Sequence, residues 1–163
     1  MMSPGKLQIS TPRECEIAMT REFDAQRRLV FDALTKPELV KRWMLGPPGW
    51  TMPVCEIDLR VGGAYRFVWR NSDGTEMGMG GIHREIVVPE KLVATEKFDH
   101  AWYPGEALVT NSLVERGGKT TLTLTVRYES RETRDLVLKS PMETGVAAGY
   151  DRLEELLASQ ASL

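Results

Sequence analysis

The chain has 163 residues, of which 42% are hydrophobic and 27% charged, and its formal net charge is −2. This length and balance are typical of one globular domain whose core needs no disulfide or metal. The weak net charge and the absence of a long basic run argue against nucleic-acid binding. The two cysteines, Cys15 and Cys55, form no close-spaced pair, so neither a disulfide framework nor a cysteine metal motif is expected.

The N-terminal sequence and the hydropathy of the chain predict a cytoplasmic protein. The opening MMSPGKLQIS lacks the charged and apolar regions of a signal peptide. No apolar run approaches the roughly 18 residues that a spanning helix requires. We therefore expect no membrane insertion.

The first three predicted elements are one strand and two short helices. Residues 1–13 show little pattern and are predicted to be a flexible lead-in. Alternating apolar and polar residues predict a half-buried strand over 14–23, with Arg21 at its solvent end. Helical spacing then predicts two short helices, the second beginning near Pro37 and ending at the Gly/Pro sequence 46–49.

A run of antiparallel strands follows. The predicted strands cover residues 50–59, 64–70, 75–88, 92–98, 107–115 and 120–128. Glycine-rich turn signals separate several of them, which favours hairpin connections. The last strand alternates most cleanly between apolar residues and threonines, as expected for a sheet with one covered face.

The C-terminal segment is predicted to be a long amphipathic helix beginning near Pro141. Its apolar residues recur at spacings of three and four, at Met142, Val146, Tyr150, Leu153 and Leu157. No other predicted element is long and apolar enough to cover the sheet. The pattern therefore predicts an α+β fold, in which a curved antiparallel sheet of about seven strands wraps around this helix.

Three phrases of the sequence resemble one known family. They are TREFDAQRRLVFDALTKPELVKRWM, LGPPGWTMPVCEIDLRVGGAYRF and GYDRLEELLAS. Residues 14–160 thus resemble the activator of heat-shock protein 90 ATPase homologue-like family, part of the START/Bet v-like SRPBCC superfamily. The resemblance implies a single helix-grip domain over 14–160, with a pocket for lipid- or polyketide-like ligands between sheet and helix. The family name also suggests a role in the stress response.

Aromatic and methionine residues are the candidates for the lining of that pocket. Methionine adapts its shape to varied apolar ligands, and tyrosine and tryptophan add a polar atom to an apolar wall. The alternative is that these residues only fill the core. The candidates are Trp43, Met52, Tyr65, Phe67, Trp69, Met79, Phe98, Trp102, Met142, Val146 and Tyr150.

Two polar residues complete the predicted site. Glu96 shares the parity of inward-facing apolar residues, and a buried carboxylate there could act as a general base. The alternative is an exposed strand end, or pairing with Arg66 or Arg70 on a neighbouring strand. His100 is expected near the pocket mouth, whereas His83 is predicted to lie on a solvated face.

Three hypotheses about function follow. The first is non-catalytic binding of a hydrophobic small molecule. The second is a cyclase- or dehydratase-type enzyme that uses Glu96, His100 and Tyr150. The third, implied by the family name, is a co-chaperone-like module acting on heat-shock protein 90. No metal or cofactor is expected, and a homodimer could form through apolar surface residues such as Val87 and Val88.

Overall fold

The computed structural model describes residues 6–161, which form eight strands and four helices. The chain begins with β1 (Gln8–Ser10) and β2 (Glu16–Phe23), followed by α1 (Arg27–Thr35) and α2 (Pro37–Trp43). The later strands are β3 (Trp50–Ile57), β4 (Ala64–Asn71), β5 (Glu76–Val87), β6 (Lys91–Phe98), β7 (Ala107–Arg116) and β8 (Lys119–Arg127). The chain continues into α3 (Arg131–Leu138) and α4 (Met142–Ala161).

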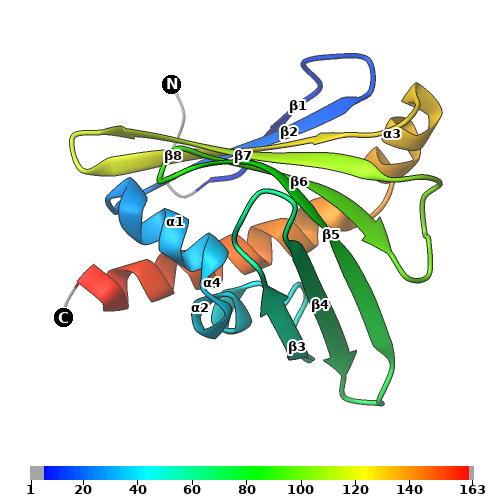
Figure 1. The fold of residues 1–163 in the computed structure, drawn as a ribbon, viewed down its shortest axis with the longest axis horizontal. Helices are drawn as coiled ribbons and strands as arrows, with labels where there is room; N and C mark the ends of the chain where they lie inside the picture. The colour runs from blue at the N-terminus through cyan, green and yellow to red at the C-terminus, as the bar shows by residue number, and fades with distance from the viewer. Residues whose placement is uncertain (1–5, 162–163) are drawn as a thin grey trace.

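All eight strands belong to one antiparallel sheet in the order β1-β2-β8-β7-β6-β5-β4-β3. The sheet is strongly curved, with β3, β4 and β5 turned away from the plane of the other strands (Figure 1). The eighth strand, beyond the about seven expected, is β1, which lies within the stretch read as a lead-in. A three-residue strand is too short to produce a recognisable alternation.

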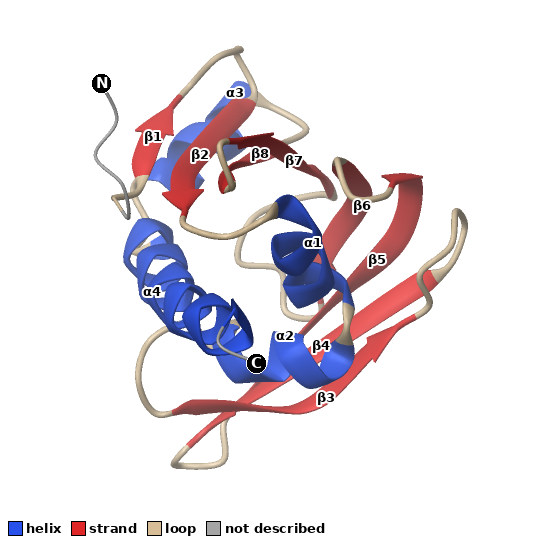
Figure 2. Ribbon diagram, turned by 90° about the vertical axis from the view of Figure 1, so that its left-hand side faces the viewer, coloured by secondary structure: helices blue, strands red, loops and turns tan. Residues whose placement is uncertain are grey.

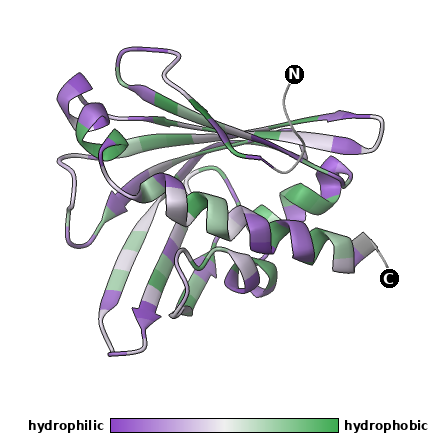
Figure 3. Ribbon diagram, turned by 180° about the vertical axis from the view of Figure 1, so that it is seen from behind, coloured by the Kyte–Doolittle hydropathy of each residue, from purple (hydrophilic) through white to green (hydrophobic). Residues whose placement is uncertain are grey.

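Helix α4 lies along the concave face of the sheet, with α1 and α2 beside it (Figure 2). Seen from behind, α4 carries both hydrophilic and hydrophobic residues, as its amphipathic sequence predicts (Figure 3). The predicted helix-grip architecture is therefore confirmed. Within residues 6–161, no helix is long and apolar enough to cross a membrane.

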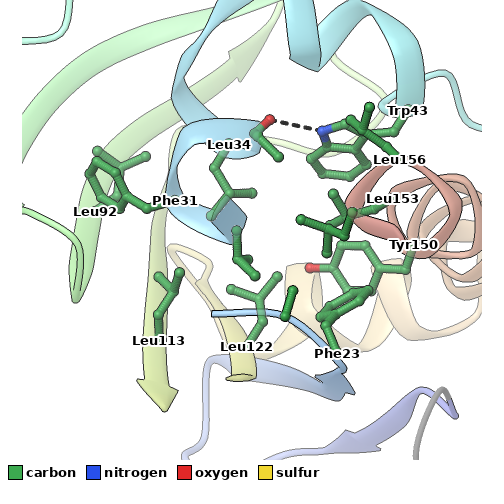
Figure 4. Close-up of a cluster of buried hydrophobic side chains, with 14 residues drawn as sticks. Phe23, Phe31, Leu34, Trp43, Leu92, Leu113, Leu122, Tyr150, Leu153 and Leu156 are labelled. Carbon is green, nitrogen blue, oxygen red and sulfur yellow. Dashed lines mark hydrogen bonds between the residues drawn. The ribbon is translucent and has the colours of Figure 1, made fainter. Parts of the chain in front are cut away.

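The C-terminal half of α4 packs into the largest hydrophobic cluster of the protein. Leu153, Leu156 and Leu157 are buried there with residues of β2, α1 and β8. The Tyr150 ring meets Phe23 edge-to-face, with ring centroids 5.5 Å apart (Figure 4). This packing fixes one half of the helix against the sheet.

Arg21 connects β2 to α4, which corrects the expectation that it lies at a solvent end. It is 1% exposed, and its Nη1 donates to Asp151 Oδ1 at 2.9 Å. Its Nη2 lies 3.4 Å from Glu154 Oε2, and its guanidinium stacks over the Phe23 ring at 5.3 Å. The carboxylates of Asp151 and Glu154 on α4 thus compensate the charge of Arg21 on the apolar face of β2.

The bend of the sheet depends on a close approach of β5 to β6. A Cβ atom on Gly81 would lie 1.9 Å from the backbone oxygen of Thr95, so glycine is required there. The Thr95 hydroxyl accepts the Ile82 backbone N–H at 2.9 Å, and the strand register shifts between His83 and Glu85. This bulge curves the sheet around α4.

The two edges of the sheet are formed by irregular strands. The β1 edge consists of three residues. The β3 edge contains Pro53, which has no N–H to donate, and its pairing with β4 shifts register between Thr51 and Val54.

We expect Gly145→Ala to stabilise the protein by about 0.5–1 kcal/mol, because alanine favours the helical backbone that Gly145 adopts in α4. There is room for the methyl group, since Pro47 Cδ at 3.8 Å is the nearest atom. Urea unfolding measures the effect. As a control, Gly62→Ala meets no nearby atom but has a φ of 86°, and should therefore destabilise the protein. A loss of stability in Gly145→Ala would contradict the assignment of free space beside α4.

Candidate functional site: an apolar cavity between sheet and helix

A cavity of about 470 Å³ lies between the concave face of the sheet and the N-terminal half of α4. Strands β2 to β8 contribute to its wall, and the loop between α2 and β3 closes one side. Its volume falls within the roughly 300–1,000 Å³ of small-molecule sites. The cavity begins where the packing around Leu153 ends, so one half of α4 stabilises the core while the other borders an open space.

Most of the residues predicted to line a pocket lie on the wall of this cavity, although their role in binding a ligand stays a prediction. They come from both walls, the sheet and α4, as the sequence parity required. These residues are Trp43, Tyr65, Phe67, Trp69, Met79, Glu96, Phe98, Trp102, Met142, Val146 and Tyr150.

Met52 and His100 do not line the cavity. Met52 is 4% exposed and packs against Val40, Phe67 and Met79 in a separate cluster. The register shift of β3 next to Pro53 makes the parity of Met52 an unreliable guide to its position. His100 is exposed at the start of the loop after β6 and does not reach the cavity. Trp102 and Tyr103 of the same loop line the cavity instead.

Several polar atoms of the aromatic wall bond to the backbone. Trp43 Nε1 donates to the Ala33 carbonyl at 2.8 Å, and Trp69 Nε1 donates to the Met44 carbonyl at 2.7 Å. The Tyr65 hydroxyl donates to the Thr95 carbonyl at 2.6 Å. These bonds fix the rings in place and leave their carbon faces to form the wall.

Solvent-exposed residues among the lining mark the entrance. Trp102 is 39% exposed and Met77 is 37% exposed, yet both line the cavity. Pro47, from the loop between α2 and β3, is likewise exposed and part of the lining. The mouth therefore lies between this loop, the start of β5 and the loop after β6.

Three acidic residues near the strand ends differ in their pairing. Asp99 forms a two-pronged ion pair with Arg66, at 2.6 and 2.5 Å, and this pair holds the pKa of Asp99 below its ordinary value. Glu76 pairs with Arg70. The Glu96 side chain has neither a hydrogen-bond nor an ion-pair partner among residues 6–161. The alternative expectation, that Glu96 pairs with Arg66 or Arg70, is therefore not met.

The unpaired carboxyl of Glu96 has an altered acidity. Burial on the concave face raises its pKa from 4.5 to about 7, because the charged form is poorly solvated there. Burial also raises the pKa of Tyr65, Tyr103 and Tyr128, and the charge of Glu96 raises it further. Glu96 and these phenols therefore form one electrostatic group within the cavity.

The structure adds polar lining residues that the sequence analysis missed, among them His83, Tyr103 and Tyr128. His83 is 4% exposed, and its Nδ1 lies 3.1 Å from the Gly63 carbonyl oxygen, so its assignment to a solvated face is wrong. His83 lies before the bulge in β5 and shares the parity of Met77 and Met79, which also line the cavity. The Tyr103 hydroxyl is buried without a hydrogen-bond partner in the described structure. Tyr128 shares the parity of the inward residues of β8, a signal that could have identified it.

The chemistry available at the cavity is limited. No cluster of three or more His, Cys, Asp or Glu residues suited to a metal ion occurs within residues 6–161. Burial raises the pKa of the Cys55 thiol to about 11, so this cysteine is protonated and a poor nucleophile near neutral pH. The site combines apolar walls with a single carboxyl group, an arrangement that can bind an apolar molecule or exchange a proton with it.

A curved antiparallel sheet closed around one long helix, with an apolar cavity between them, defines a helix-grip domain of the START-like class. The family model "Activator of Hsp90 ATPase homolog 1-like protein" matches residues 24–158. The chain belongs to this family, within the SRPBCC group, as the three sequence phrases indicated. No curated protein matches the chain significantly.

Solved structures support this assignment. A Rhodobacter sphaeroides protein is 32% identical, with a TM-score of 0.88, covering 94% of this chain and 99% of its own. Nitrosomonas europaea protein NE0264 is 24% identical, with a TM-score of 0.82 and coverages of 94% and 100%. The Silicibacter pomeroyi AHSA1 protein is 21% identical, with a TM-score of 0.71 and coverages of 89% and 99%. The latter two show similarity of fold.

Proposed function

We propose that this protein binds a hydrophobic small molecule in the cavity between the sheet and α4, without transforming it. The observation that carries the proposal is the cavity of about 470 Å³ itself, lined by aromatic, methionine and aliphatic side chains. A well-packed core leaves few voids larger than a water molecule, so an apolar space of this size costs packing energy. A ligand that fills the cavity would recover that energy, and the exposed mouth at Trp102 gives it a path of entry.

Titration with the fluorescent apolar probe N-phenyl-1-naphthylamine tests this proposal. Val109→Trp should weaken probe binding by about tenfold or more, because the larger side chain fills space that the probe needs. Val109 lines the cavity from β7. Val114→Trp is the matched control, since Val114 lies on the same strand but is 51% exposed outside the cavity.

A second cavity-filling variant guards against a local folding defect in Val109→Trp. Val146→Trp narrows the cavity from the α4 side instead. Circular dichroism melting checks that each variant is folded. Undiminished probe binding in both folded variants would contradict the proposal, and native mass spectrometry of the purified protein would show any retained ligand directly.

The second hypothesis, an enzyme of the cyclase or dehydratase kind, is favoured by one observation. Glu96 has a pKa raised to about 7, which suits a general base near neutral pH. His100 is exposed away from the cavity, so it does not support this mechanism. Unchanged turnover of a candidate polyketone by Glu96→Gln would remove Glu96 as the base.

The co-chaperone hypothesis rests on the family description, which names activation of the Hsp90 ATPase. An ATPase assay with a cognate Hsp90 tests it, and an unchanged ATPase rate would remove it. Cytoplasmic location, a stress-response role and a homodimer stay predictions alongside it.

A further inference from the structure

The one carboxyl group of the cavity wall lies on the same strand as an aromatic lining residue. Glu96 lies on β6 two residues from Phe98, on the same face of the sheet, and both line the cavity. Tyr103 and Tyr128 line the same cavity, and the Tyr103 ring packs against both Phe98 and Tyr128. The cavity wall thus combines one carboxyl group with several aromatic rings.

The rings near Glu96 form a continuous group, here called the aromatic cluster: Phe98, Trp102, Tyr103 and Tyr128. Tyr103 is its centre, with ring centroids 5.9 Å from Phe98, 5.0 Å from Trp102 and 5.2 Å from Tyr128, each pair edge-to-face. Because neighbouring rings are nearly perpendicular, they present π faces in different directions. A cation placed over a free π face of this cluster would be attracted by the ring quadrupole.

Two groups in this region lack the partners that buried polar groups normally have. The Tyr103 hydroxyl is buried, in a residue that is 4% exposed, and bonds to no atom of the described structure. Glu96, which is half-buried, also lacks a hydrogen-bond or ion-pair partner among residues 6–161. A buried polar group without a partner costs free energy, so a bound molecule that supplies partners would be favoured.

The charge of the cavity wall decides the sign of that molecule. Among the described residues that line the cavity there is no lysine or arginine, and Glu96 is the single acidic side chain. A carboxylate ligand such as a fatty acid would meet no positive charge there and would be repelled by Glu96. A ligand cation would neutralise Glu96 and contact the aromatic cluster.

We propose that the cavity binds a hydrophobic amine or quaternary ammonium compound, with its cationic group between Glu96 and the aromatic cluster and its apolar part against α4. This inference rests on the proposed function, because it assigns a chemical class to the ligand of the same cavity. Lipid-like and small aromatic amines share this chemistry. The cation-binding region is built from β6, the loop after β6 and the end of β8.

Binding of a permanent cation should depend on pH through Glu96. The carboxyl gains its charge as pH rises through about 7, so affinity should rise with it. The other ionisable groups on the cavity wall, taken from each element in turn, are Tyr65 of β4, His83 of β5, Tyr103 of the loop, Tyr128 after β8 and Tyr150 of α4. The tyrosines stay neutral, since burial raises the pKa of each. Because His83 is also ionisable and lines the cavity, a Glu96 variant must separate its contribution from that of Glu96.

Calorimetric titration with decyltrimethylammonium, decanol and decanoate tests the inference, because the three share one apolar chain and differ in charge. At about pH 8.5 the cation should bind about tenfold tighter than decanol, and decanoate most weakly. At about pH 5.5 the preference for the cation should fall below about threefold, since Glu96 is then neutral.

Two variants locate the effect. Glu96→Gln should bind the cation and decanol with similar affinity at both pH values. Glu106→Gln is the matched control: Glu106 is an exposed acid near the same region, outside the lining, and its removal should leave the preference intact. A preference retained in Glu96→Gln, or decanoate binding tighter than the cation, would overturn the inference.

The same titrations distinguish failure of this inference from failure of the proposed function. If N-phenyl-1-naphthylamine and decanol bind in the cavity without any preference for the cation, the inference fails and the proposed function stands. If none of these probes binds, both fail.

Discussion

At about pH 8, Glu96→Gln should be more stable than the unchanged protein, with a gain in the free energy of unfolding on the order of 3 kcal/mol. Burial raises the pKa of Glu96 from 4.5 to about 7, so the folded protein holds a proton that the unfolded chain releases more readily. Glutamine keeps the shape of the side chain but carries no charge to bury. The gain in the free energy of unfolding equals the free-energy cost of an ionised carboxyl group on the cavity wall.

The sign of the pH dependence follows from the raised pKa. Below about pH 4.5, Glu96 is protonated in both states and imposes no penalty. As pH rises from there through about 7, the unfolded chain loses its proton first, and the stability of the folded protein declines. Urea unfolding of both proteins at several pH values should show their stabilities separating over this window.

Glu106→Gln serves again as the control, because Glu106 is exposed and its removal should leave stability within about 0.5 kcal/mol. Equal stabilities of Glu96→Gln and the unchanged protein at both ends of the pH range would contradict burial of an unpaired carboxyl. A measured gain would show that this carboxyl lowers stability, as ionisable groups at functional sites often do.

Leu153→Ala should destabilise the protein by about 2–5 kcal/mol, because it removes buried methyl groups from the centre of the core and leaves a void. Leu153 is fully buried on α4, in the cluster with Phe23, Leu122 and Tyr150 (Figure 4). These contacts hold α4 against the sheet beyond the end of the cavity. Urea or thermal unfolding measures the loss.

Leu136→Ala is the matched control for this substitution. Leu136 also lies on a helix, α3, but is 48% exposed, so its replacement should change stability by less than about 0.5 kcal/mol. A loss of less than about 1 kcal/mol in Leu153→Ala would mean that α4 is not held by this cluster.

The elements with a regular pattern could be predicted from the sequence. The stripe of Met142, Val146, Tyr150 and Leu153 identified α4 and the face that covers the sheet. Parity likewise placed Glu96 on the inner face. Both predictions depend on local periodicity, which fixes the direction of a side chain once the element forms.

Most of the missed features have causes that one strand's pattern does not contain. His83 is the exception, because it shares the inward parity of Met79, whereas its charged neighbours Arg84 and Glu85 suggested a solvated face. Arg21 is buried because Asp151 and Glu154 reach it from α4, a contact between distant segments. Tyr103 lies in a loop, where no period indicates its direction. The cavity itself depends on how far the sheet and α4 stand apart, which is set by packing rather than by pattern.

The irregular edge strands have a consequence for behaviour at high protein concentration. An exposed edge is a template on which a second chain can add a strand, and this is a common route to aggregation. Here β1 offers three residues, and Pro53 interrupts the donors of β3. The sheet is therefore a poor template for chain-to-chain strand addition at either end, although it does not close into a barrel.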